Sequence, residues 1–104
     1  MLTTQVFHIL LALADGERHG YAIMQEVEER TGGELRLGPG TLYGALKRLL
    51  DEGLIEELEA DEERRRYYRL TAAGRKAARA EAERLESLVA LAKQKRVIPS
   101  TRTA

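Results

Sequence analysis

Five residues near the middle of the chain could together contact a phosphate backbone. Thr41 and Tyr43 supply hydroxyl groups, and Lys47 and Arg48 supply positive charges. Arginine and lysine bind phosphates or guanine edges, and hydroxyl groups donate hydrogen bonds to phosphate oxygens. Gly44 lies among them, and a residue without a side chain permits close approach of a ligand. This set is typical of a nucleic-acid-binding surface, although exposed lysine and arginine are also ordinary on a solvated helix.

One helix must position these residues, and the sequence predicts it from Pro39 to Glu52. Proline suits a first helical turn because its missing N–H needs no partner there. An apolar stripe follows at helical spacing, formed by Leu42, Ala45, Leu46 and Leu49. The five residues above point away from this stripe, with Tyr43 at its margin. A helix of this length measures roughly 21 Å, which fits a major groove.

Two more helices are predicted before this one. The first covers residues 2–14, with Thr3 or Thr4 as its N-cap, and contains His8, which we interpret as a structural or interface residue. The second covers residues 20–31, and glycines directly follow it.

A β-hairpin is predicted after the central helix, because the apolar period changes there. Residues 54–59 and 64–70 form its two strands, and Tyr68 faces the core. No Asn-Gly pair marks the turn, so a long and mobile tip is expected. The order of elements predicts a mainly α fold with a small β-hairpin, a winged helix-turn-helix.

The last predicted helix begins after the N-cap Thr71 and reaches about Arg96. It is longer than one small core requires. A heptad-like seam of small and aliphatic residues runs along it, formed by Ala78, Ala82, Leu85, Leu88, Val89 and Ala92. A partner chain can cover this seam, which makes the helix a dimer interface, or the helix can pack back onto its own domain.

Charge is balanced overall but is unevenly distributed. From Asp51 to Glu63 there are eight acidic residues and no base, and from Arg64 to Arg79 there are seven bases and no acid. Two interpretations fit this pattern. The two runs form solvated surfaces that pair with each other, or Arg64, Arg65 and Arg66 form a local basic patch for phosphates.

Composition excludes several classes of protein. The 104 residues suffice for one compact domain, and cysteine is absent, so disulfides and thiolate metal sites are excluded. Two histidines are too few for a dedicated zinc site. No nucleophile–base–acid set suggests an enzyme, and no cofactor is expected. No apolar run is long enough for a membrane span and no signal-peptide pattern opens the chain, so a cytoplasmic location is expected.

Several short segments, taken together and in order, resemble one family. They are His19-Gly20-Tyr21-Ala22-Ile23, Gly38-Pro39-Gly40-Thr41-Leu42-Tyr43, Leu46-Lys47-Arg48-Leu49, Gly53-Leu54-Ile55 and Arg66-Tyr67-Tyr68-Arg69-Leu70-Thr71-Ala72-Ala73-Gly74. The chain resembles the PadR family of bacterial transcriptional regulators over roughly residues 1–97. Two departures are Gly44, where the family often has proline, and Leu50, where an acidic residue is common.

The resemblance implies a DNA-binding winged helix-turn-helix domain over 1–71 and a dimerisation helix over 72–97. Pro99 bars extension of that helix, so a disordered tail is expected over 98–104. It implies a homodimeric repressor that binds an inverted-repeat operator in double-stranded DNA and is released by a small-molecule or stress signal. It also places the start of the second helix, with His19 and Tyr21, near the DNA backbone. A packing role for Tyr21, with His19 at the helix boundary, fits as well. The chain lacks tryptophan, so ligand stacking on a C-terminal tryptophan is not carried over.

Two other functions remain open at this point. A winged helix can serve as a protein-interaction module without binding DNA, which zero net charge favours mildly. Such a module would present apolar or acidic residues on the outer side of the central helix. A repressor without an effector, constitutive or autoregulatory, is the second alternative, and the sequence does not separate it from a ligand-responsive one.

Overall fold

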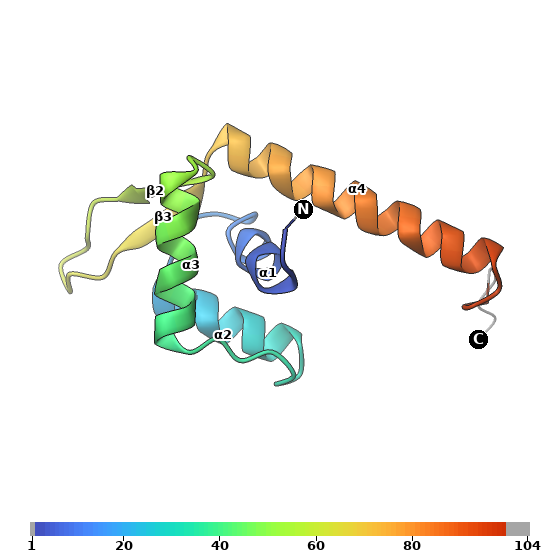
Figure 1. The fold of residues 1–104 in the computed structure, drawn as a ribbon. Coiled ribbons are helices and arrows are strands. Elements are labelled where there is room, and N and C mark those ends of the chain that lie inside the picture. Colours follow the sequence, from blue (N-terminus) through green and yellow to red (C-terminus); the bar gives the residue numbers. More distant parts are fainter. Residues whose placement is uncertain (1, 100–104) are drawn as a thin grey trace.

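The computed structural model describes residues 2–99, which form a helical body from which two elements project in opposite directions (Figure 1). The elements are α1 (Thr4–Ala12), β1 (Arg18–His19), α2 (Gly20–Arg30), α3 (Pro39–Asp51), β2 (Ile55–Leu58), β3 (Tyr67–Leu70) and α4 (Ala72–Gln94). The mainly helical fold with a small hairpin and a long C-terminal helix is thereby confirmed.

Side chains cap three of the helices. The hydroxyl groups of Thr3 and Thr71 each accept a hydrogen bond from the backbone amide three residues ahead, at 3.1 and 3.0 Å. The cap of α2 is the imidazole of His19, whose Nδ1 accepts from the amide of Ala22 at 3.2 Å. Caps satisfy amides that have no partner inside the helix. These residues therefore fix where α1, α2 and α4 begin.

The sheet has three strands, one more than the sequence predicted. Its order is β1-β3-β2 with both pairs antiparallel, and β1 places Arg18 opposite Tyr68 and His19 opposite Tyr67. Strand β3 starts at Tyr67 and not at Arg64, where the sequence predicted it. Arg64, Arg65 and Arg66 therefore belong to the hairpin tip. We call residues 59–66 the hairpin tip.

The core lies where α1, α2 and α3 meet the hairpin. The largest side chains that are fully buried are those of Ile9, Leu10, Leu13, Ile23, Val27, Leu42, Leu46 and Leu49. Tyr68 is 2% exposed, which confirms its predicted place in the core, and burial raises the pKa of its phenol. The leucines of α3 thus anchor one side of that helix and leave the opposite side in solvent.

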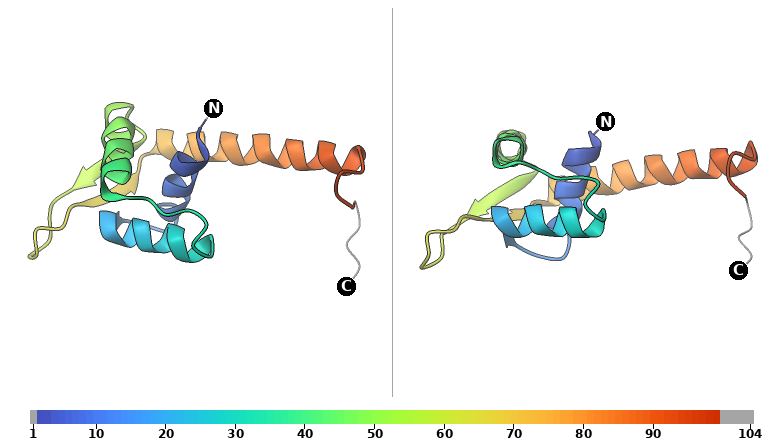
Figure 2. Two further views of the ribbon diagram at one scale, coloured as in Figure 1. Left: turned by 60° about the horizontal axis from the view of Figure 1, so that its bottom comes forward. Right: turned by 90° about the horizontal axis from the view of Figure 1, so that it is seen from below.

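Only the beginning of α4 packs on the body. Gly74 is buried so closely that a methyl group there would lie 1.8 Å from the carbonyl oxygen of Leu54. Ala78 packs against the core, and Glu81 is 6% exposed. The rest of α4 extends away from the body (Figure 2). The helix ends at Gln94, two residues before the predicted end, and residues 100–104 of the predicted tail lie outside the described residues.

Within residues 2–99, no helix has the length and apolar character needed to span a membrane. No group of His, Asp and Glu side chains in the same residues is arranged to hold a metal ion.

Candidate nucleic-acid interface

The solvent side of α3 carries all five residues that the sequence assigned to it. Thr41, Tyr43, Gly44, Lys47 and Arg48 are exposed, opposite the buried leucines. At about 100° per residue, Gly44 lies in the middle, Thr41 and Arg48 on one side, and Tyr43 and Lys47 on the other. We call these five residues the α3 outer face. Its centre has no side chain, so the helix backbone itself is accessible there.

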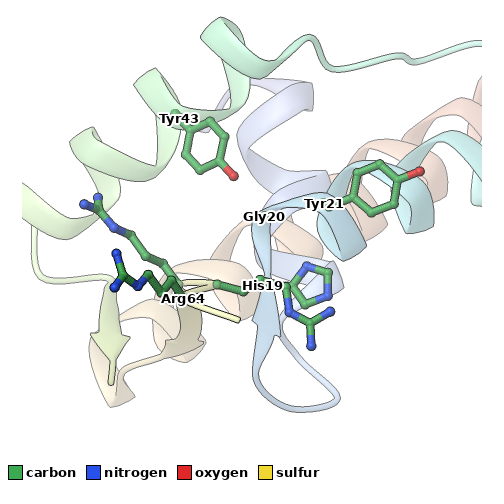
Figure 3. A pocket seen from close by; sticks show the side chains of 7 residues that line it. His19, Gly20, Tyr21, Tyr43 and Arg64 are labelled. Atoms are coloured by element: carbon green, nitrogen blue, oxygen red, sulfur yellow. The ribbon is translucent and has the colours of Figure 1, made fainter. Parts of the chain in front are cut away.

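A concavity of about 410 Å³ lies between α3, the start of α2 and the hairpin tip. Its lining residues are His19, Gly20, Tyr21, Tyr43, Arg64, Arg65 and Arg66 (Figure 3). We call it the basic concavity. Five of the seven were predicted from the sequence as DNA-contact residues, and the structure brings them together from three separate segments.

Gly20 gives the Tyr43 side chain its place in the basic concavity. The hydroxyl group of Tyr43 points toward Gly20 (Figure 3). A methyl group on Gly20 would lie 2.5 Å from that hydroxyl oxygen, so any larger residue must displace the tyrosine. Sequence reasoning placed Gly20 at the start of a helix but missed this contact, because α2 and α3 meet only in the folded chain.

Tyr21 occupies a different position from Tyr43. Its ring points away from Tyr43 (Figure 3), and the residue is 60% exposed. It also borders a smaller groove of about 270 Å³, which Arg36 lines too. The exposure favours the surface role of Tyr21 over the packing role.

A second groove flanks α3 on the side of α1. It measures about 340 Å³. Its lining includes Thr41, Gly44 and Arg48 from α3, with Gln5 from α1 and the N-cap Thr3. The α3 outer face is therefore a ridge between two concave surfaces.

Ion pairs divide the basic run into two groups. Arg65 binds Asp61 with Nε 2.8 Å from the carboxylate, and Arg69 pairs with Glu56 across β2 and β3. In the part of the chain that the structure describes, no ion pair involves Arg64 or Arg66, nor Lys47 or Arg48 of the α3 outer face. Arg65 and Arg69 therefore pair with the acidic run, as the first interpretation of the charge runs expects. Whether Arg64 and Arg66 form a patch for phosphates stays a prediction.

The sequence placed His19 at the helix boundary, but its two structural roles were not predicted. Besides capping α2 it packs edge-on against the ring of Tyr67, with the ring centroids 5.3 Å apart. It thereby joins α2 to the hairpin beside the basic concavity. The available signal was its position directly before a helix that starts with Gly20, where a capping side chain is expected.

Comparison with known proteins establishes the family. Residues 9–80 match the model of the transcriptional regulator PadR-like family. The chain belongs to this family. Over 83 residues it is 45% identical to a transcriptional regulator of Mycobacterium tuberculosis, with 78% of this chain and 75% of that protein covered. Family membership confirms the expectation of a transcriptional regulator rather than an enzyme.

A second relative is an uncharacterized 37.1 kDa protein of a Streptomyces fradiae transposon, 48% identical over 80 residues. The match covers 77% of this chain but only 22% of that protein, so the chain spans about a fifth of the length of this relative.

Solved structures agree with the fold. A PadR family regulator from Clostridium difficile superimposes with a TM-score of 0.77 at 30% identity, covering 86% of this chain and 94% of that one. The structure of Bacillus subtilis PadR in complex with operator DNA gives a TM-score of 0.67 at 26% identity, covering 77% of this chain and 47% of that one. The winged helix-turn-helix predicted from the order of elements is the fold of these PadR family regulators.

Proposed function

We propose that this PadR-like regulator is a homodimeric repressor that binds an inverted-repeat operator in double-stranded DNA. The observation that carries the proposal is the position of bases that have no ion-pair partner within residues 2–99. Lys47 and Arg48 lie on the α3 outer face, and Arg64 and Arg66 line the basic concavity, which borders that face at Tyr43. An operator-bound structure of a PadR relative with the same fold supports it.

In this proposal α3 enters the major groove with Gly44 closest to the bases. Lys47 and Arg48 contact guanine edges or phosphates, and Thr41 donates to a phosphate. Arg64 and Arg66 of the hairpin tip, with Tyr21 and Tyr43, follow the backbone beside the groove. Arg65 contributes less because its guanidinium already binds Asp61. The basic outer face argues against a winged helix used only for protein contacts.

The second part of the proposal is a dimer formed through α4. Gly74, Ala78 and Glu81 lie on the side of α4 that packs on the body. At helical spacing this side continues as Leu85, Leu88 and Ala92. Leu85, Leu88 and Val89 are 37%, 48% and 47% exposed.

A second copy of the chain is the occupant that fits this stripe, because its α4 carries the same apolar residues and a two-fold axis lets each cover the other. Ala78 contacts its own core, so among the predicted interface residues the contact is expected chiefly from Ala82 onward. Two DNA-binding heads on such a dimer would meet the groove about 34–36 Å apart, one turn of DNA.

Release by a small-molecule or stress signal and a location in the bacterial cytoplasm complete the proposal. Neither concavity beside α3 identifies a ligand class for release. A screen of compounds against the protein–DNA complex, scored by loss of DNA binding, separates a responsive repressor from a constitutive one.

The proposal is tested with a duplex selected from a random DNA pool by the purified protein. Lys47→Ala with Arg48→Ala is expected to abolish retention of this duplex in a gel shift, while light scattering still gives the dimer mass. Lys93→Ala with Lys95→Ala is the matched control, since it removes the same charge from the far end of α4.

Retention of the duplex by the Lys47→Ala, Arg48→Ala variant at the wild-type protein concentration would overturn the assignment of α3. Selection of no duplex by the wild-type protein would overturn DNA binding itself and favour a protein-interaction module.

A further inference from the structure

A single carboxylate organises the hairpin tip. Oδ1 of Asp61 accepts hydrogen bonds from the backbone amides of Glu63 and Arg65, at 3.0 and 2.8 Å. Oδ2 accepts from Nε of Arg65 at 2.8 Å and from the hydroxyl group of Tyr67 at 3.3 Å. Asp61 is only partly exposed, with 26% of its side chain accessible. One residue therefore connects both sides of the tip to the start of β3.

Arg64, in the middle of this network, has an uncommon backbone conformation. Its φ is +65°, a region that costs energy for a residue with a side chain. Its amide donates to the carbonyl oxygen of Asp61 at 2.9 Å, and Asp61 donates its own amide to the carbonyl of Arg65 at 3.3 Å. The strain at Arg64 is thus offset by bonds that begin and end at Asp61.

The strained residue is also a lining residue of the basic concavity. Arg64 and Arg66 line it together with Tyr43 of α3 and with His19, the last residue of β1 and the N-cap of α2. The tip conformation decides whether these two arginines lie beside α3 or move freely in solvent.

We infer that Asp61 is a positioning residue for DNA binding: it fixes the hairpin tip so that Arg64 and Arg66 are held beside α3 before DNA arrives. This inference rests on the proposed function. Ordering a long flexible side chain on binding costs affinity, and a tip that is already ordered avoids that cost. Asp61 itself need not contact DNA.

Simple electrostatics predicts the opposite effect of removing Asp61 on DNA affinity. The sign of the measured change therefore tests the inference. Asp61 is an anion close to a surface that binds phosphates, so its removal should strengthen DNA binding if charge alone matters. If Asp61 positions the arginines, its removal should weaken binding although a repulsive charge is lost.

Asp61→Ala and Glu62→Ala form a matched pair, since each removes one carboxylate from adjacent positions of the tip, and Glu62 is exposed. Asp61→Ala is expected to weaken binding of the selected duplex roughly three- to tenfold. Glu62→Ala is expected to leave binding unchanged or strengthen it. Asp61→Asn should be intermediate, because its amide oxygen still accepts from the backbone but its NH₂ group cannot accept from Arg65.

Two further measurements separate positioning from general destabilisation. The Asp61→Ala change should have no additional effect on binding when Arg64 and Arg66 are both alanine. In the DNA-free protein, the strong nuclear Overhauser effect between the amide and α protons of Arg64 is a sign of positive φ. It should weaken in Asp61→Ala to the level typical of negative φ. The midpoint of thermal unfolding should stay close to the wild-type value, because the tip lies outside the core.

Binding by Asp61→Ala that equals or exceeds wild type would overturn the inference and leave the proposed function intact. An undiminished effect of Asp61→Ala in the Arg64→Ala, Arg66→Ala background would also overturn it. A wild-type protein that selects no duplex would contradict the proposed function, and the inference with it.

Discussion

The solvent side of α3 and the free end of α4 are both exposed, yet they present opposite chemistry. The α3 outer face carries hydroxyl groups and positive charges around a glycine. The free end of α4 carries Leu85, Leu88 and Val89, each more than a third exposed. Polar groups around an accessible backbone suit phosphates and base edges. A continuous apolar stripe suits another apolar stripe.

This difference shows how a chain with no net charge is equipped to bind a polyanion. The acidic residues of the tip and of β2 hold part of the basic run in ion pairs, as Asp61 does for Arg65 and Glu56 for Arg69. Arg64 and Arg66 of the same run have no ion-pair partner within residues 2–99 and line the basic concavity beside Tyr43 of α3. In the proposed dimer, contact through the apolar stripe brings two such basic surfaces together. The affinity for DNA then depends on where the charges lie and on having two copies, rather than on total charge.

The largest effect is expected from a charge placed in the apolar stripe of α4. Leu85→Lys puts a charge in the middle of the proposed interface and should give monomers by light scattering. Its binding to the selected duplex should weaken about a hundredfold or more, because the second binding event is no longer intramolecular. The α3 outer face is unchanged in this variant, so the loss would show that the two surfaces act together.

Leu91→Lys is the matched control for this change. Leu91 is 43% exposed, but at helical spacing it lies well to one side of the stripe that runs through Leu85 and Ala92. It should remain a dimer with near-wild-type affinity. A dimeric Leu85→Lys variant, or an equal loss in both variants, would contradict the proposed arrangement.

Replacing Gly44, at the centre of the α3 outer face, is expected to have two smaller effects of opposite sign: higher stability and weaker DNA binding. A methyl group on Gly44 would meet nothing within 4 Å, and alanine is favoured over glycine inside a helix by roughly 0.5–1 kcal/mol. Gly44→Ala should therefore raise the midpoint of thermal unfolding. It should also weaken DNA binding about tenfold, since one lost base contact typically costs about 1–3 kcal/mol.

Higher stability is thus accompanied by weaker DNA binding only if DNA approaches the helix backbone at Gly44. A Gly44→Ala variant that is more stable and binds as tightly as wild type would place the contact elsewhere on α3.

The sequence predicted the elements with a strong local signal. The leucines of α3 repeat at helical spacing and are buried, and Thr3 and Thr71 cap helices as expected. Strand β1 was missed because two residues, Arg18 and His19, carry no periodicity. They form a strand only through pairing with β3, which lies almost fifty residues away in the chain.

The candidate site was predicted residue by residue, but not the way its parts are held together. The arginines at 64–66 were identified from charge, whereas the contact of Gly20 with Tyr43 needs two helices in place. The tip was expected to be long and mobile because Asn-Gly is absent. It is long, but Asp61 orders it, and the aspartate was itself a signal, since aspartate side chains commonly bond the backbone two residues ahead.

The smallest expected effect is on the pH dependence of stability and comes from His8 in the helical body. His8, interpreted from the sequence as a structural residue, joins α1 to α2: Arg30 donates to its carbonyl oxygen at 3.0 Å, and Nδ1 lies 3.3 Å from the same guanidinium group. Burial, and then the positive charge of Arg30, lower the pKa of His8 below its ordinary value of 6.5. The neutral imidazole is therefore the form that suits the folded chain.

The sign of the pH effect follows from this shift. The unfolded chain binds a proton at His8 more readily than the folded chain does, so stability falls as the pH drops below about 6.5. Asp61 and Glu81, whose pKa values are also lowered, lose their contribution only at more acidic pH.

His8→Gln should therefore flatten the decrease in the unfolding midpoint between about pH 7.5 and about pH 5.5, a span that brackets the ordinary histidine pKa. The decrease that it removes should amount to a few degrees at most. DNA binding at neutral pH should be unchanged, because His8 belongs to neither the α3 outer face nor the basic concavity. An identical pH dependence in both proteins would mean that the neutral imidazole beside Arg30 does not stabilise the α1–α2 contact.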